Sequence, residues 1–75
     1  DKQIENQIAY YTEEKGIRWI KIVASPMIAA YLRRGFWSIR TKWQFKYRCR
    51  IKIREDQSLG MLETKILDKK GRTLM

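Results

Sequence analysis

The sequence has no histidine, a single cysteine, a single proline and only eight acidic residues among 75. One cysteine excludes a disulfide framework, and the lack of histidine excludes zinc sites built from both residue types. Small secreted domains commonly need such cross-links, so their absence favours a reducing, cytoplasmic setting. No hydrophobic run approaches the ~20 residues of a membrane span, and no signal peptide is recognisable.

Residues for catalysis are scarce as well. Without histidine or a cysteine pair, arrangements of a nucleophile with its base are hard to build, and no glycine-rich phosphate loop is present. The acidic residues Glu55, Asp56, Glu63 and Asp68 are of the type that binds Mg²⁺, but Glu55 and Asp56 are more typical of a turn between strands. We therefore predict no catalytic residue, no metal site and no cofactor, with Cys49 as a small buried apolar side chain.

Positive charge is what the chain has in excess. Seventeen Lys and Arg residues give a formal net charge of +9. Such a field attracts polyanions, namely RNA, DNA or an anionic membrane. The length predicts a single domain over residues 1–75, and a start at Asp1 rather than Met predicts a fragment of a longer chain.

The first half of the chain predicts a helix, a strand and a second helix. Apolar residues at helical spacing indicate a helix over Asp1–Lys15, and the β-branched run 17–24 indicates a central strand covered on both faces. Ser25 and Pro26 are typical of a helix start. Tyr31 is expected to face the sheet, together with Ile28, Ala29 and Leu32.

Two further helical and strand patterns follow. Gly35 is expected to end or bend the helix, and residues 36–44 predict a helical stretch that is either separate or continuous with it. From residue 47 to residue 54, apolar and basic side chains alternate, which predicts a half-buried strand with a basic outer face. Residues 61–67 predict its partner strand, with Leu62, Thr64 and Ile66 inward. The predicted fold is α+β, a small and mainly antiparallel sheet with helices on one face, in the order α-β-α(α)-β-β.

Cations and aromatic side chains are concentrated between Arg33 and Arg54, a stretch without any acidic residue. Cations neutralise phosphates, and exposed aromatic rings stack unpaired bases. Phe36, Trp43 and Tyr47 are expected in the core, whereas Trp37 lies off the buried face and is the candidate for stacking. The predicted RNA-binding residues are Arg33, Arg34, Trp37, Arg40, Lys42, Lys46, Arg48, Arg50, Lys52 and Arg54.

Two other partners fit the same residues. The basic strand is also suited to an acidic protein or to another subunit, as in an oligomerisation module. A membrane surface is the third partner, since Phe36 and Trp37 are flanked, as in an interfacial amphipathic helix, by the cations Arg33, Arg34, Arg40 and Lys42. We expect that apolar face to pack on the sheet, which disfavours the membrane.

Four segments together resemble the C-terminal small domain of ribonucleases E and G. These are the strand I-K-I-V-A, the following S-P-M-I-A-A-Y-L, the basic strand C-R-I-K-I-R-E-D and the closing L-E-T-K-I-L. The matching positions are Val23, Pro26, Ile28, Ala29, Tyr31, Leu32, Arg50, Ile53, Asp56 and Glu63.

The resemblance implies an accessory module of a bacterial-type endoribonuclease for RNA processing. In that family the Mg²⁺-binding aspartates lie in a different domain, so none of them carries over to this chain. The small domain there supports subunit association and the RNA-facing framework. The isolated domain is therefore expected not to cleave RNA, and its expected partners are single-stranded RNA and other domains or subunits of the parent enzyme.

Overall fold

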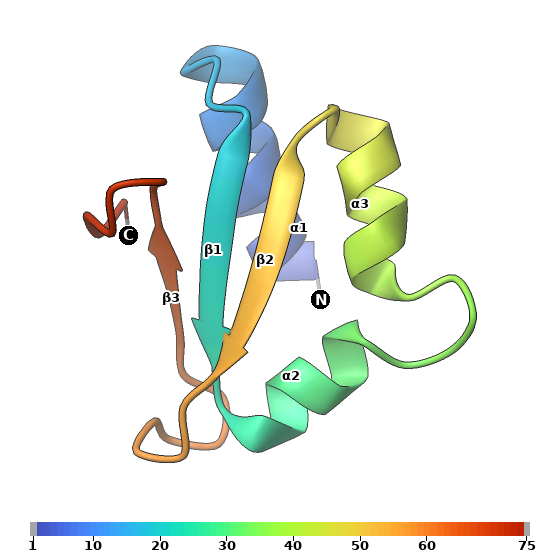
Figure 1. The fold of residues 1–75 in the computed structure, drawn as a ribbon, viewed down its shortest axis with the longest axis vertical. Helices are drawn as coiled ribbons and strands as arrows, with labels where there is room; N and C mark the ends of the chain where they lie inside the picture. Colours follow the sequence, from blue (N-terminus) through green and yellow to red (C-terminus); the bar gives the residue numbers. More distant parts are fainter. Residues whose placement is uncertain (1, 75) are drawn as a thin grey trace.

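The computed structural model describes residues 2–74, which form an α+β domain with three helices around a three-stranded sheet (Figure 1). The predicted fold class and the order α-β-α-α-β-β are confirmed. The predicted first helix becomes α1 followed by a π-helical continuation, η1; Asp1 lies outside the described residues. The elements are α1 (Lys2–Ala9), η1 (Tyr10–Glu14), β1 (Trp19–Ala24), α2 (Pro26–Leu32), α3 (Ile39–Tyr47), β2 (Arg50–Glu55) and β3 (Thr64–Leu67).

The sheet is mixed rather than mainly antiparallel, with strand order β2-β1-β3. Strand β1 is parallel to β2 and antiparallel to β3. The expected pairing of β3 with the preceding strand is therefore wrong. Parallel neighbours need a long helical crossover, which α2 and α3 supply, and the loop 56–63 then carries the chain past the end of β1 to its other edge. The hydrogen bond from Asp56 N to Ala24 O (2.8 Å) closes that end.

Two serine caps decide where the helices begin. Ser25 Oγ accepts a hydrogen bond from Ile28 N at the start of α2, as the sequence predicts, and donates one to Met61 O (2.6 Å), which fastens the 56–63 loop. Ser38 Oγ accepts from Thr41 N (3.2 Å), so the predicted helical stretch 36–44 begins three residues later, as α3. Helices α2 and α3 are therefore separate.

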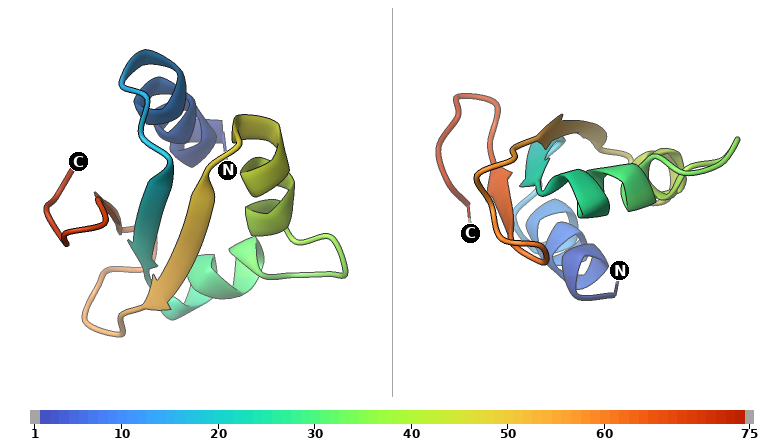
Figure 2. Two further views of the ribbon diagram at one scale, coloured as in Figure 1. Left: turned by 45° about the horizontal axis from the view of Figure 1, so that its top comes forward. Right: turned by 90° about the horizontal axis from the view of Figure 1, so that it is seen from below.

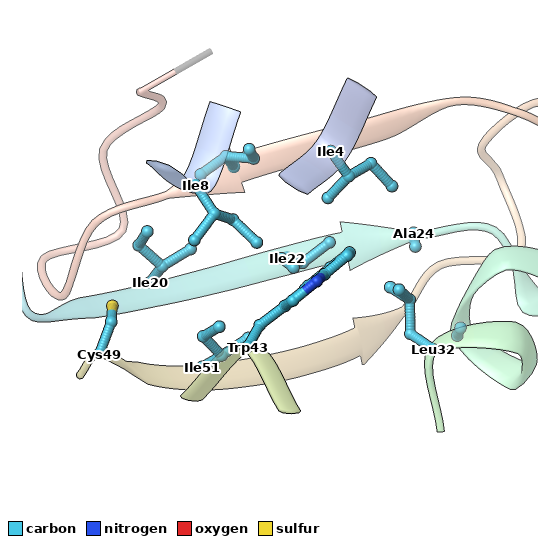
Figure 3. Close-up of a cluster of buried hydrophobic side chains, with 11 residues drawn as sticks. Ile4, Ile8, Ile20, Ile22, Ala24, Leu32, Trp43, Cys49 and Ile51 are labelled. Carbon is cyan, nitrogen blue, oxygen red and sulfur yellow. The ribbon is translucent and has the colours of Figure 1, made fainter. Parts of the chain in front are cut away.

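The core lies on one face of the sheet. Figure 3 shows Ile4 and Ile8 of α1 above Ile20 and Ile22 of β1, with Trp43 of α3 beside them. Trp43 is 5% exposed, which confirms its predicted place in the core. The remaining buried members of the cluster are Ala24, Ala29, Leu32, Cys49, Ile51 and Ile66.

Three predicted core side chains are exposed instead. Phe36 is 95% exposed because it belongs to the loop before the Ser38 cap and not to a helix. Leu62 lies in the turn before β3, and Tyr31 lies off the face of α2 that carries Ala29 and Leu32. Tyr47 packs at the edge of the core, half-buried.

The second face of the sheet is open. Helix α1 lies behind the sheet and α2 and α3 lie beside β2, so that no helix of residues 2–74 crosses the front (Figure 2). The prediction that β1 is covered on both faces is therefore wrong. On the open face of β1, Trp19 and Lys21 are half-exposed, and Val23 alone is buried. Among residues 2–74, no helix has the length and apolar character needed to cross a bilayer.

Candidate nucleic-acid interface

Strand β2 presents a row of cations on the open face. Arg50, Lys52 and Arg54 are exposed, and they alternate with Ile51 and Ile53, which face the core. Alternate residues of a strand lie about 7 Å apart on one face, close to the phosphate spacing of a single strand. The basic outer face predicted for this strand is confirmed for these three residues.

Arg48 reaches the same region from a different backbone position. The expected strand 47–54 starts later, because Tyr47 ends α3 and Arg48 caps it in the left-handed conformation (φ 51°, ψ 50°). The Arg48 N–H donates to Gln44 O. A side chain other than glycine is uncommon in this conformation. Arg48 thus contributes its cation from the corner between α3 and β2.

The outer edge of β2 is covered by side chains rather than by another strand. Arg33 Nη2 donates to Ile53 O (2.6 Å) and Arg40 Nη1 donates to Ile51 O (3.2 Å). Gln44 Oε1 accepts from Ile51 N (2.9 Å). An unpaired strand edge is a template for unwanted pairing, so these contacts protect β2. The composition of the chain does not indicate that these side chains protect the edge of β2. The one sequence signal for this role is the spacing of Arg40 and Gln44, which places both on the same face of a helix.

Two grooves lie along this edge and share residues. The first, of about 460 Å³, is lined by Arg40, Gln44, Arg48, Cys49, Arg50 and Lys52. The second, of about 420 Å³, is lined by Arg33, Phe36, Arg40, Lys52 and their neighbours. Because Arg40 and Lys52 line both grooves, the two lie next to each other. We call the two together the β2 trough, and define its cations as Arg33, Arg40, Arg48, Arg50 and Lys52.

An exposed aromatic cluster adjoins the trough. Phe36 contacts Trp37 edge-on, with ring centroids 6.1 Å apart, and Trp37 lies 5.8 Å from Phe45. Trp37 is 55% exposed, as its position off the buried face predicts. Lys42 and Lys46 line a shallow groove beside Trp37 and Phe45. Phe36 also lines the trough, so it links the trough to this cluster.

The predicted binding residues therefore fall into two groups. Trp37, Lys42 and Lys46 lie on the outer side of α3 and its preceding loop, apart from the trough. Arg54 continues the cationic row of β2 on the open face. Arg34 is exposed beyond the end of α2 and is not among the residues that line these grooves.

Acidic side chains do not neutralise the trough. Within residues 2–74 two ion pairs form, Lys46–Glu5 and Arg72–Asp68, and neither involves a trough cation. Hydrogen bonds from Lys46 and Tyr47 hold the pKa of Glu5 below its ordinary value. Lys46 is thus the one predicted binding residue that is engaged by a carboxylate in the described structure.

The described residues offer no assembled metal site or activated thiol. No group of three or more Cys, Asp or Glu side chains comes together among them. Burial raises the pKa of the Cys49 thiol, which keeps it protonated at neutral pH. Its side chain belongs to the core.

Comparison with protein-family models, with curated proteins and with solved structures finds no match to this chain. The structure defines the chain as a small α+β domain with a three-stranded mixed sheet, one open basic face and a protected strand edge.

Proposed function

We propose that the domain binds the phosphate backbone of single-stranded RNA along the β2 trough and the adjoining row of β2. The supporting observation is the set of trough cations, which come from the C-terminal caps of α2 and α3, from α3 and from β2, and which form no ion pair within residues 2–74. Gathering like charges costs stability through self-repulsion, and a bound polyanion removes that cost while its counterions are released. Arg54 extends the same row on the open face.

A single strand fits better than a duplex because the cations are followed by exposed rings. A strand that leaves the trough past Phe36 meets Trp37, and its unpaired bases can stack there. A stacked base contributes about 1–3 kcal/mol. Lys42 stands beside Trp37 to receive a phosphate. In a duplex the bases are already stacked on one another and cannot use these rings.

The protected edge of β2 bears on the protein-partner alternative. A partner that adds a strand needs the free N–H and C=O groups of β2, but Ile51 and Ile53 already bond to Gln44, Arg40 and Arg33. An acidic protein would have to bind through side chains alone. Arg33 and Arg40 remain able to contact phosphates, because each of their bonds to β2 uses one of five guanidinium N–H groups.

The aromatic cluster supports the membrane alternative more than the sequence predicted. Phe36 was expected in the core, yet it lies in solvent with Trp37 and Phe45. Binding to anionic vesicles is therefore included as a control. The larger group of cations lies in the trough, away from these rings, and this distribution favours RNA.

The resemblance to the small domain of ribonucleases E and G gives the proposal its setting. The domain would serve as an RNA-binding or assembly accessory of a bacterial-type, cytoplasmic RNA-processing endoribonuclease, without catalytic residues of its own. The residues of the resemblance have structural roles that suit this reading: Pro26 starts α2, and Ala29 and Leu32 enter the core. The isolated domain is expected not to cleave RNA in the presence of Mg²⁺.

A paired charge reversal tests the proposal. Fluorescence anisotropy with a labelled single-stranded RNA of about 12 nucleotides measures affinity for the wild type, for Arg50→Glu with Lys52→Glu, and for Lys2→Glu with Lys15→Glu. The two double variants change the net charge equally, but Lys2 and Lys15 lie on and just after the α1–η1 segment. We expect a loss of at least about tenfold for the trough variant and a much smaller one for the control.

Three results would contradict the proposal. Equal losses in both variants would mean that RNA responds only to net charge. Unchanged RNA affinity in the trough variant would leave the acidic protein as the partner. Binding of anionic vesicles in preference to RNA would favour the membrane.

A further inference from the structure

A separate groove lies where β1 begins and β3 ends, outside the stretch from Arg33 to Arg54. It has a volume of about 600 Å³ and lies between the start of β1 and the turn that follows β3. Four cations line it, Arg18, Lys69, Lys70 and Arg72, together with the indole of Trp19 and the carboxylate of Asp68. We call it the Trp19 groove. Residues some fifty positions apart in the chain form it, which is why sequence patterns did not indicate it.

The one carboxylate of the groove is fully engaged. Asp68 Oδ1 accepts from Lys70 N (2.9 Å) and Arg72 N (2.8 Å), and Oδ2 pairs with Arg72 Nε (2.9 Å). These bonds shape the turn and lower the pKa of Asp68. Four cations against one carboxylate leave the groove with a net charge of +3. The groove is therefore suited to an anion.

Trp19 gives the groove a flat apolar surface. Its ring is half-exposed, and Lys21 Nζ lies 6.0 Å from the ring centroid. An ammonium on a half-exposed, flexible side chain leaves such a ring at small cost, and the ammonium then becomes available to a phosphate. A planar ring surrounded by cations is the combination that holds a nucleotide, because the base stacks while its phosphate is neutralised.

The Trp19 groove adjoins the β2 trough. Trp19 and Arg50 are direct partners in the parallel pairing of β1 and β2, so their side chains lie on the same face of the sheet. Arg50 lines the trough. Arg18 Nη1 also donates to Tyr47 O (3.1 Å), next to the Arg48 corner. A strand lying in the trough is thereby led across Arg50 to Trp19.

We propose that the Trp19 groove binds an unpaired nucleotide of the same RNA strand, with its base on the Trp19 ring and its phosphate between Lys69 and Lys70. This inference rests on the proposed function. It adds a second binding point near β1 and β3, whereas the aromatic cluster lies beyond the β2 edge of the sheet. It makes Trp19 a base-stacking residue.

Abasic RNA tests the stacking role. Wild type and Trp19→Leu are compared on a single-stranded oligouridine of about 12 nucleotides and on an abasic strand of the same length and charge. We expect Trp19→Leu to lose affinity for the oligouridine by about five- to 150-fold and to bind the abasic strand as the wild type does. The matched control is Tyr10→Leu, an exposed aromatic on η1, which should change neither affinity.

A second variant tests the phosphate side and does not alter the sheet. Lys69→Gln with Lys70→Gln should flatten the salt dependence of oligouridine affinity by about 0.7 in log–log slope, since the one phosphate held between them is no longer neutralised. Equal losses by Trp19→Leu on both strands, or an unchanged slope in the lysine variant, would overturn the inference. If those variants behave as the wild type while Arg50→Glu with Lys52→Glu loses RNA, the proposed function stands and the Trp19 groove is not part of it. If the wild type binds neither strand, the proposed function itself fails.

Discussion

Arg48 occupies a backbone position that glycine would fill at lower cost, and replacing it should separate stability from binding. Its φ of 51° and ψ of 50° place it in the left-handed region, as the cap of α3. For an L-residue with a Cβ this conformation costs about 1–2 kcal/mol. Glycine escapes that cost but loses more backbone freedom on folding, about 0.5–1 kcal/mol.

The balance predicts that Arg48→Gly stabilises the domain by about 0.5–1 kcal/mol. For a chain of this size that corresponds to a rise in Tm of about 2–8 °C, measured by circular dichroism. The same substitution removes one trough cation. Affinity for single-stranded RNA at about 0.15 M salt should fall about fourfold, and the log–log salt slope should flatten by about 0.7.

Arg48→Lys is the matched control because it keeps both the charge and the strained backbone. It should match the wild type in Tm and in salt slope. The reasoning would be refuted by an Arg48→Gly variant less stable than the wild type, since the left-handed conformation would then cost less than the backbone freedom that glycine loses on folding. An unchanged salt slope would show that Arg48 neutralises no phosphate.

The remaining predictions concern stability. Gln44→Ala leaves Ile51 N without its acceptor at the β2 edge, so the free energy of unfolding in urea should fall by about 1–2 kcal/mol. The control, Gln57→Ala in an exposed turn, should not change the stability. Equal stability of the two variants would count against edge protection. Asp68 has a lowered pKa because Arg72 donates to its carboxylate, so its stabilisation is present above its ordinary pKa of 3.8 and is lost as the pH falls through its lower folded value. The Tm difference between wild type and Asp68→Asn should therefore be largest near neutral pH and shrink as the pH falls below 3.8; a difference that does not shrink would contradict the role of the charged carboxylate.

Local patterns predicted the elements whose signals lie in a few neighbouring residues. The alternation of Arg50, Ile51, Lys52 and Ile53 identified β2 and its outer face. Ser25 followed by proline placed the start of α2 correctly. In both cases, short-range chemistry fixes the structure: a period of two residues for a strand, and a side-chain cap for a helix.

Other features depend on distant residues, and the sequence could not reveal them. Alternation shows that residues 64–67 form a strand but not that β1 is the partner. Phe36 has helical spacing, but the Ser38 cap starts α3 after it. Arg33 and Arg40 were predicted from charge alone, whereas their bonds to Ile53 and Ile51 depend on where α2 and α3 pack.

The basic trough and the protected edge are two results of one arrangement. The crossover from β1 to β2 brings α3 alongside β2, and the arginines that satisfy the edge carbonyls also bring positive charge to it. Charge at an edge strand is a common way of preventing aggregation. In this domain the charge exceeds that need, since Arg48, Arg50 and Lys52 make no ion pair within residues 2–74.

The central claim, that the trough neutralises RNA phosphates, is tested most directly by the salt dependence of wild-type affinity for single-stranded RNA. The five trough cations and Arg54 predict a linear fall of log affinity with log salt between about 50 and 200 mM, with a slope between about −2 and −4. A slope near zero, or no measurable binding at the lowest salt, would contradict the account.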